Sequence, residues 1–230
     1  MTNISSNPAI DLTSSSRQLN ALKPNGSQNQ NIAELESAAD QFESIFQFGE
    51  SRASTSATID LDHFAHFQHF EVGYTFDTSW TPRLQLQYDY ASGDDDIGDS
   101  DNNRFNTLFG ARRFDFGPTS IYGPFARSNL NTPGIRLTLK PRNKVNVFIA
   151  LRGFWLASDD DAWTTARINN TTGQSENYIG TQLETRLRWD IVPGNLRLEA
   201  GAAHIFAGDL MDKAGKTDAT YIYTQASFSF

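Results

Sequence analysis

Arginine, lysine and acidic side chains alternate with apolar ones along several short stretches of the sequence. In TQLETRLRWDI, residues 181–191, Leu183 and Trp189 occupy odd positions, whereas Arg186 and Arg188 occupy even ones. This alternation is typical of a β-strand whose two faces meet different surroundings. A guanidinium group offers a planar fork of N–H donors that forms paired hydrogen bonds with a carboxylate. The charged face therefore predicts binding of carboxylate groups.

Ten charged residues fall on one face when each alternating stretch is aligned by its apolar positions. They are Arg83, Arg136, Lys140, Lys144, Arg152, Arg186, Arg188 and Arg197, together with Glu184 and Glu199. The whole chain has a formal net charge of −8, so this concentration of cations would create a local positive field. We predict that the ten residues line a path for an anionic ligand. Alternatively, the acidic and basic side chains neutralise one another within the wall of the sheet.

Three histidines in HFAHFQH, namely His63, His66 and His69, could act as metal ligands. On a helix the three side chains would share one side, whereas on a strand His66 would face away from the other two. The segment adjoins an alternating stretch, so we favour the strand and predict no metal site.

Aspartates cluster in the segments 94–101 and 159–161. An EF-hand aligned from Asp99 fails, because Arg104 stands where glycine is required and Gly110 replaces the final glutamate. We therefore favour solvated loop carboxylates over a calcium site.

Motifs of the common hydrolases are absent from the sequence. It contains no nucleophile elbow, phosphate-binding loop or zinc-protease motif. His204 falls on an apolar face, and no nucleophile adjoins it in the sequence. We predict that the protein is not an enzyme and needs no cofactor.

The composition restricts the class of protein that carries this charged face. The 230 residues contain no cysteine, which excludes disulfide scaffolds and thiolate metal sites. No run of about 18 apolar residues occurs, so we expect no transmembrane helix. The strands of a membrane barrel need only about 9–11 residues and are half polar, so the composition permits such a barrel. The acidic balance argues against nucleic acid as a partner.

A two-residue period continues from about residue 68 to the end of the chain. It predicts about seven strands, at residues 69–77, 83–92, 134–140, 144–158, 178–191, 195–206 and 220–230. Short turns (78–82, 141–143 and 192–194) alternate with long polar loops (93–133, 159–177 and 207–219). Short turns on one side and long loops on the other are typical of an outer-membrane barrel. We therefore predict an all-β fold, an antiparallel up-and-down meander that is part of a transmembrane β-barrel.

The first 55 residues differ from residues 56–230, which form the predicted barrel domain. Residues 1–30 are rich in Ser, Asn and Gln, which is typical of disorder, and they lack the apolar core of a signal peptide. Residues 31–48 place apolar side chains at helical spacing, with Asn31 as N-cap, so we expect a short helix there.

Four stretches carry a resemblance to a known family. They are LQYDYASGDDD, DNNRFNTLFGARRFDFGPTSIYGPFARSN, FWLASDDDAWTTA and RWDIVPGNLRLEAGA. From about residue 60 to residue 230 the sequence resembles the carboxy-terminal part of the alginate export family. The members of that family are outer-membrane β-barrels of Gram-negative bacteria, and the better-known ones secrete the anionic polysaccharide alginate.

The resemblance implies an outer-membrane, porin-like conduit through which an anionic polysaccharide such as alginate diffuses passively. It implies outer-membrane lipid as a second partner, and barrel-assembly machinery that recognises Phe230 as a third. The barrels of the family have more strands, and its members carry signal peptides. We therefore expect an open or incomplete barrel in a chain whose amino-terminal part is missing. The alternative is a soluble β-sandwich that presents its basic face to acidic glycans.

Overall fold

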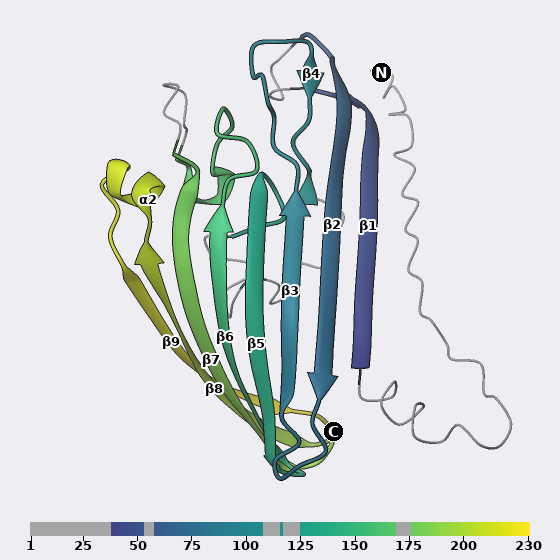
Figure 1. Cartoon of the computed structure of the whole chain (residues 1–230), viewed down its shortest axis with the longest axis vertical. Coiled ribbons are helices and arrows are strands. Elements are labelled where there is room, and N and C mark those ends of the chain that lie inside the picture. The colour runs from purple at the N-terminus through teal and green to yellow at the C-terminus, as the bar shows by residue number, and fades with distance from the viewer. Residues whose placement is uncertain (1–37, 53–57, 108–115, 117–124, 169–175) are drawn as a thin grey trace, which may run out of the picture.

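The protein forms one curved sheet (Figure 1) in a computed structural model that describes residues 38–52, 58–107, 116, 125–168 and 176–230. Nine strands of these described residues belong to the sheet, in the order β1-β2-β3-β5-β6-β7-β8-β9, with β4 beside β2. The strands are β1 (Ala38–Ser51), β2 (Leu61–Thr75), β3 (Arg83–Ala91), β4 (Asp101–Asn102), β5 (Leu130–Arg142), β6 (Val145–Trp155), β7 (Tyr178–Val192), β8 (Leu196–Ala207) and β9 (Ala219–Phe228). Within the described ranges, two short helices, η2 (Thr164–Ala166) and α2 (Asp209–Lys213), lie in the connections.

The predicted antiparallel meander is confirmed. All seven predicted strands are present, as β2, β3 and β5 to β9, and each pairs antiparallel with its neighbour in this series. The short turns after β2, β5 and β7 lie at one end of the sheet, and the longer connections lie at the other end (Figure 1). None of the helices in the described residues is long and apolar enough to cross a membrane.

The helix predicted for residues 31–48 is wrong over residues 38–48, which belong to β1. β1 pairs with β2 over its whole length, from Ala38 opposite Tyr74 to Ser51 opposite Leu61. Phe42 and Phe46 fit a helical spacing, but they are also both even-numbered and therefore share one face of a strand. The hydrogen bonds to β2 decide between the two periods, because β2 supplies partners for the backbone of β1. Residues 31–37 lie outside the described residues, as do residues 1–30.

β1 changes the count of strands. The sheet begins at Ala38, ahead of the boundary expected at residue 56, and it has eight long strands plus the short β4 in the described residues. The sheet is not closed, because β1 and β9 are not paired with each other. The expected open barrel is thus confirmed, although the sheet contains more strands than the seven predicted.

The two faces of the sheet differ in the way the alternation predicts. Leu183, Leu187 and Trp189 on the convex face of β7 are 41%, 44% and 45% exposed, whereas Gln182 and Glu184 on the concave face are 7% and 9% exposed. The register predicted for β7 is therefore confirmed. This distribution, with apolar side chains exposed and polar ones buried, is the reverse of that in a soluble protein. It is typical of a barrel wall between lipid and a polar lumen.

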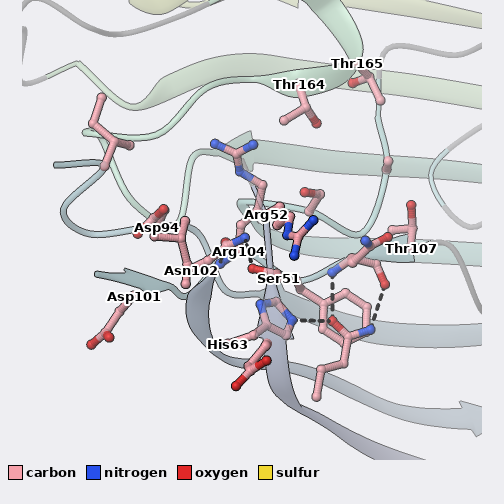
Figure 2. A pocket seen from close by; sticks show the side chains of 18 residues that line it. Ser51, Arg52, His63, Asp94, Asp101, Asn102, Arg104, Thr107, Thr164 and Thr165 are labelled. Carbon is pink, nitrogen blue, oxygen red and sulfur yellow. Dashed lines mark hydrogen bonds between the residues drawn. The ribbon is translucent and has the colours of Figure 1, made fainter. Parts of the chain in front are cut away.

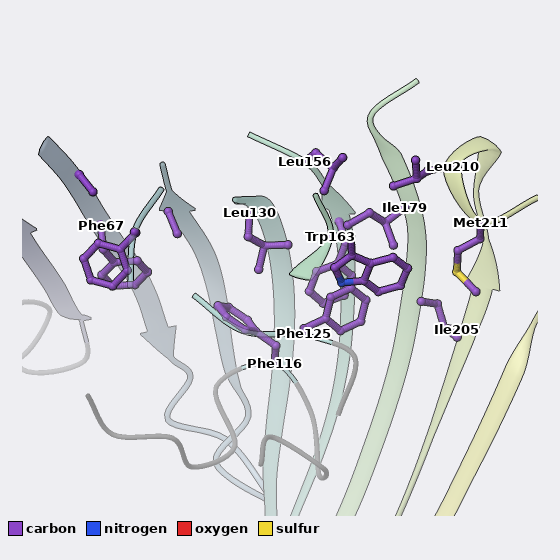
Figure 3. Close-up of a cluster of buried hydrophobic side chains, with 14 residues drawn as sticks. Phe67, Phe116, Phe125, Leu130, Leu156, Trp163, Ile179, Ile205, Leu210 and Met211 are labelled. Carbon is purple, nitrogen blue, oxygen red and sulfur yellow. The ribbon is translucent and has the colours of Figure 1, made fainter. Parts of the chain in front are cut away.

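Near the long connections, the concave face carries an apolar cluster (Figure 3). The rings of Phe125 and Phe154 stack with their centroids 3.6 Å apart, and Trp163 lies 5.5 Å from Phe125. Phe154 belongs to β6, whereas Phe125 and the equally buried Phe116 belong to the connection between β4 and β5. Phe116 and Phe125 therefore pack against β6 on the concave face, at the long-loop end of the sheet.

Candidate functional site

Six of the predicted cations line a single pocket on the concave side, at the short-turn end of the sheet. The pocket has a volume of about 470 Å³, and its cations are Arg136, Lys140, Lys144, Arg186, Arg188 and Arg197. Among the described residues that line it, Asp190 is the sole carboxylate. The residues come from β5, β6, β7, β8 and the turn between β5 and β6. Pairing of these strands thus assembles a strongly basic pocket from residues far apart in the sequence.

Two of these arginines share an aromatic platform. The guanidinium carbons of Arg136 and Arg186 lie 4.8 Å and 4.5 Å from the ring centroid of Phe148. Strand pairing fixes this arrangement, because Phe148 on β6 stands directly opposite Arg186 on β7 and Thr138 on β5. Cation–π attraction holds a guanidinium in place without neutralising its charge.

The same two arginines have unused hydrogen-bonding capacity. Neither Arg136 nor Arg186 lies within ion-pair distance of an acidic group of the described residues, and the Nε atom of each is buried without a hydrogen-bond partner there. Lys140 and Lys144 also form no ion pair with the described residues, and Lys144 donates to the backbone oxygen of Ile191 at 3.4 Å. Four cations of the pocket therefore have no ion-pair partner among the described residues.

The remaining predicted arginines are paired with acidic groups. Arg188 lies 2.9 Å from Glu199, and Tyr223 donates to the same carboxylate at 2.7 Å. Arg197 lies 2.6 Å from Asp190. These two arginines therefore fit the alternative interpretation, in which acidic and basic side chains neutralise one another within the wall of the sheet.

Arg152 lies deeper in the sheet, where it is buried. It donates to Asp89 at 2.6 Å and to Gln87 at 2.9 Å, and His69 binds the other oxygen of Asp89 at 2.6 Å. Its guanidinium also lies 5.3 Å from the ring of Phe116. This network joins β2, β3 and β6 to Phe116, so Arg152 has a structural role in the wall of the sheet.

The last two predicted residues also lie on the concave face. Arg83 is 3.9 Å from Glu71 and donates to Thr75 at 3.2 Å. Glu184 is buried and is separated from Arg136 by Ala150, which pairs with both residues. The structure therefore places the ten predicted residues on one side of the sheet and divides their cations into paired and unpaired sets.

Phe148 and Tyr223 contact the predicted charged residues but were not themselves predicted to belong to the site. Phe148 has the same parity as Arg152 on β6, so the two-residue period already contained the signal that it faces the cations. Tyr223 lies opposite Gly201 on β8, and its ring covers that glycine, which has no side chain. This contact could be predicted only from the pairing of β8 with β9.

The histidines follow the expectation for a strand. His69 binds Asp89 on the concave side, His63 lies 3.5 Å from Gln47, and His66 stacks on Tyr90 with ring centroids 5.4 Å apart. No group of three histidine, aspartate or glutamate side chains within the described residues is arranged to hold a metal ion.

A second pocket, of about 620 Å³, lies among the long connections (Figure 2). Figure 2 shows Arg52, His63, Asp94 and Arg104 among the side chains that line it. Arg104 donates to Asp161 through Nε at 2.6 Å and also through Nη2. The pocket contains both acidic and basic groups, in contrast to the basic pocket at the other end.

The prediction of solvated loop carboxylates is wrong for two aspartates. Asp161 is fully buried because Arg104 pairs with it, and Asp94 is 7% exposed. Burial raises the pKa of the Asp94 carboxyl, and one of its oxygens has no hydrogen-bond partner in the described residues. Burial also lowers the pKa of the Arg104 guanidinium.

The chain was compared with known proteins. A search of curated proteins finds no match. A family model described as alginate export matches residues 14–225. This match covers most of the chain and agrees with the open, antiparallel, all-β sheet. The protein therefore belongs to the alginate export family, a family of outer-membrane β-barrel transport proteins.

Proposed function

We propose that the concave face of this sheet is part of the wall of a conduit through which an anionic polysaccharide, such as alginate, is exported across the outer membrane. The main support for the proposal is the basic pocket, in which four cations form no ion pair with the described residues. The pocket is basic although the whole chain has a net charge of −8. In the proposed mechanism the polymer diffuses passively, and the positive field of the wall guides it.

Arg136 and Arg186 have the central role in this proposal. Their guanidinium groups are held over Phe148, and each has a buried Nε–H without a partner in the described residues. A uronate carboxylate that approaches the pocket would supply the missing acceptor in a charge-assisted hydrogen bond. Lys140 and Lys144 would add positive charge at the mouth of the pocket, because both lie near the turn between β5 and β6.

The acidic residues on the same face would limit how long one sugar stays bound. Glu184 is separated from Arg136 by Ala150, and Glu199 neutralises Arg188. Transport requires that binding be strong enough for entry and weak enough for release. In this proposal, alternation of free and neutralised cations provides that balance.

The convex face and the end of the chain would contact the other proposed partners. The exposed leucine, isoleucine and phenylalanine side chains of the convex face suit outer-membrane lipid. Phe230 follows β9 and is exposed, as recognition by barrel-assembly machinery requires. We further propose that this sheet is one part of a larger barrel, because the outer edges of β1 and β9 have no partner in the described residues.

The soluble sandwich is not supported. A sandwich buries the apolar face of one sheet against a second sheet, whereas all nine strands of the described residues lie in a single sheet. Its apolar face is exposed along β2, β3 and β7. We therefore do not retain a second candidate function.

Equilibrium binding of labelled uronate oligomers to the detergent-folded chain tests the proposed role of the pocket. The wild-type chain should bind oligouronate, bind a neutral oligosaccharide of the same length far more weakly, and lose affinity as salt is raised. The double variant Arg136→Gln/Arg186→Gln should weaken uronate binding by roughly ten-fold or more, since hydrogen bonds to charged groups contribute about 1.5–3 kcal/mol.

A matched control removes two positive charges elsewhere. Lys213 and Lys216 lie in and after α2, at the opposite end of the sheet from the basic pocket. Lys213→Gln/Lys216→Gln should leave uronate affinity nearly unchanged. Equal losses in the two double variants would show that overall charge, and not this pocket, governs binding, and the proposed role of the pocket would fail.

A further inference from the structure

The pocket of about 620 Å³ among the long connections has three carboxylates in its lining (Figure 2). Glu50 lies on β1, Asp101 lies on β4, and Asp94 lies in the connection between β3 and β4. None of the three lies within ion-pair distance of a cation of the described residues. The three carboxylates therefore bring negative charge to this pocket that no ion pair balances there.

The two arginines that line the same pocket already have acidic partners. Arg52 lies 2.5 Å from Asp60, and Arg104 donates to Asp161 through both Nε and Nη2. Neither Asp60 nor Asp161 belongs to the described lining of the pocket. Each arginine is thus neutralised from outside the pocket, and neither offers a free charge to an anionic ligand.

Asp94 has an oxygen that needs a hydrogen-bond donor. The residue is 7% exposed, and its Oδ1 atom has no hydrogen-bond partner in the part of the chain that the structure describes. Burial raises the pKa of its carboxyl, and the attraction of Arg104 does not outweigh that effect. A donor supplied by a ligand would therefore meet a buried acceptor that the fold leaves unsatisfied.

His63 contributes a second unsatisfied acceptor to the pocket. The backbone of Asn106 fixes the orientation of the Gln47 carboxamide, since Gln47 Nε2 donates to the Asn106 oxygen at 2.7 Å and the Asn106 N–H donates to Gln47 Oε1 at 2.8 Å. Gln47 Oε1 lies 3.5 Å from His63 Nε2, and an amide oxygen only accepts, so Nε2 carries the proton of the neutral ring. Nδ1 is then an acceptor, and it is buried without a partner in the described residues.

These features restrict the chemistry of a ligand. Two unsatisfied acceptors and three unbalanced carboxylates favour a positively charged group with several N–H donors. An anionic sugar would meet the carboxylates without a free cation to bind it. The described residues bring no three ligands together in the manner of a metal site. The volume, about 620 Å³, falls in the range of sites for small organic molecules.

We propose that this pocket binds a small organic amine in its ammonium form. The N–H groups of the amine donate to Asp94 Oδ1 and His63 Nδ1, and Glu50 and Asp101 add negative charge around it. The pocket lies among the long connections, at the opposite end of the sheet from the basic pocket. The inference goes beyond the proposed transport function and does not depend on which polymer passes.

Calorimetric titration of the full-length, detergent-folded chain with putrescine, a diamine, tests the proposal. Butanediol, which has the same carbon chain and no charge, should bind at least ten-fold more weakly than putrescine. Asp94→Asn should weaken putrescine binding by roughly ten-fold or more, because it removes a charged hydrogen-bond acceptor. Glu50→Gln/Asp101→Asn changes two exposed side chains and should weaken binding several-fold.

A matched control removes two exposed carboxylates that lie outside the pocket. Asp209 and Asp212 belong to α2, and Asp209→Asn/Asp212→Asn should leave putrescine affinity nearly unchanged. Asp94→Asn removes a buried charge, so its melting temperature at pH 7 should not fall below that of the wild type, and weaker binding would not reflect unfolding. Its affinity for oligouronate should also equal that of the wild type, which separates this test from that of the basic pocket.

Four results would overturn the proposal. They are absence of putrescine binding by the wild-type chain, equal affinities for putrescine and butanediol, undiminished putrescine binding by Asp94→Asn, and equal losses in Glu50→Gln/Asp101→Asn and the α2 control. The last result would mean that the net negative charge of the chain, and not this pocket, attracts the amine.

Discussion

At the scale of single residues, neighbouring cations on one face differ because only some of them have an acidic partner. Arg188 and Arg186 are two residues apart on β7, yet Arg188 lies 2.9 Å from Glu199, whereas Arg186 lies over Phe148 and has no ion pair in the described residues. An ion pair contributes little to the field at a distance, since its charges cancel. We therefore expect the unpaired Arg186 to contribute more to anion binding than the paired Arg188.

Neutralising Glu199 should strengthen anion binding. Glu199→Gln frees the Arg188 guanidinium from its carboxylate partner, so we expect oligouronate affinity to rise several-fold and to become more sensitive to salt. The control is Arg188→Gln/Glu199→Gln, which removes both charges and should leave affinity within about two-fold of wild type. Weaker binding by the single variant in titrations of labelled oligouronate would contradict this account.

Asp94 should make stability depend on pH. Burial raises the pKa of its carboxyl in the folded protein, so the folded state binds the proton more tightly than the unfolded state does. Its ionised form therefore lowers stability at neutral pH, and this penalty disappears as pH falls below the unfolded value of about 3.9.

Asp94→Asn removes the charge and should raise the melting temperature at pH 7. The difference in melting temperature between Asp94→Asn and the wild type should shrink as pH falls through the raised pKa of Asp94. Thermal melts of the detergent-folded protein from about pH 3, below the reference pKa of about 3.9, up to about pH 7 measure this difference. An equal difference at all pH values would show that the carboxylate is not the cause.

At the scale of elements, the long connections are held by buried polar contacts. Asp161, in the connection between β6 and β7, is fully buried and accepts from Arg104 and from the backbone N–H of Asp94. Both of these partners belong to the connections around β4. One carboxylate thus joins the two longest connections.

Asp161→Asn should loosen both connections while the strands remain paired. We expect faster hydrogen exchange in residues 93–107 and 158–166, equivalent to about 3 kcal/mol. This is the lower end of the range for breaking a buried ion pair, because the Arg104 side chain is 34% exposed. The control is Asp60→Asn, since Asp60 and Arg52 form an exposed pair at 2.5 Å. Exchange in the control should match wild type, and the same result for Asp161→Asn would argue against a stabilising role of the buried pair.

The elements were largely predictable from the sequence because a two-residue period is a local property. It located β2, β3 and β5 to β9 and the face of each charged residue. β1 was mistaken for a helix because Phe42 and Phe46 fit both periods, and only pairing with β2 distinguishes them. β4 was missed because two residues are too few to show a period.

Pairing of the charges was not predictable, because it depends on register between strands. Arg152 and Asp89 are 63 residues apart in the sequence and 2.6 Å apart in the structure. Arg188 meets Glu199 because the β7–β8 register places them opposite each other. The sequence therefore supported a cationic face, but it could not separate the unpaired cations from the paired ones.

At the scale of the whole molecule, the sheet separates two environments. Its convex face is apolar and exposed, and its concave face is polar, charged and partly covered by the side chains of Phe116 and Phe125. An unclosed sheet of this kind suits neither water nor lipid, since water meets the apolar face and lipid meets unpaired edges. Membership of the alginate export family therefore favours a closed barrel around a polar lumen, of which this sheet is one part.

The central claim is that the cations of the concave face select an anionic polysaccharide for passage, and transport through vesicles tests it most directly. Vesicles carrying a closed barrel that contains this sheet are loaded with labelled oligouronate and a neutral oligosaccharide of the same length. The account predicts faster release of the oligouronate by the wild-type chain, and loss of this preference in Arg136→Gln/Arg186→Gln but not in Lys213→Gln/Lys216→Gln. Equal release of the two oligosaccharides by the wild-type chain, or release of neither, would contradict it.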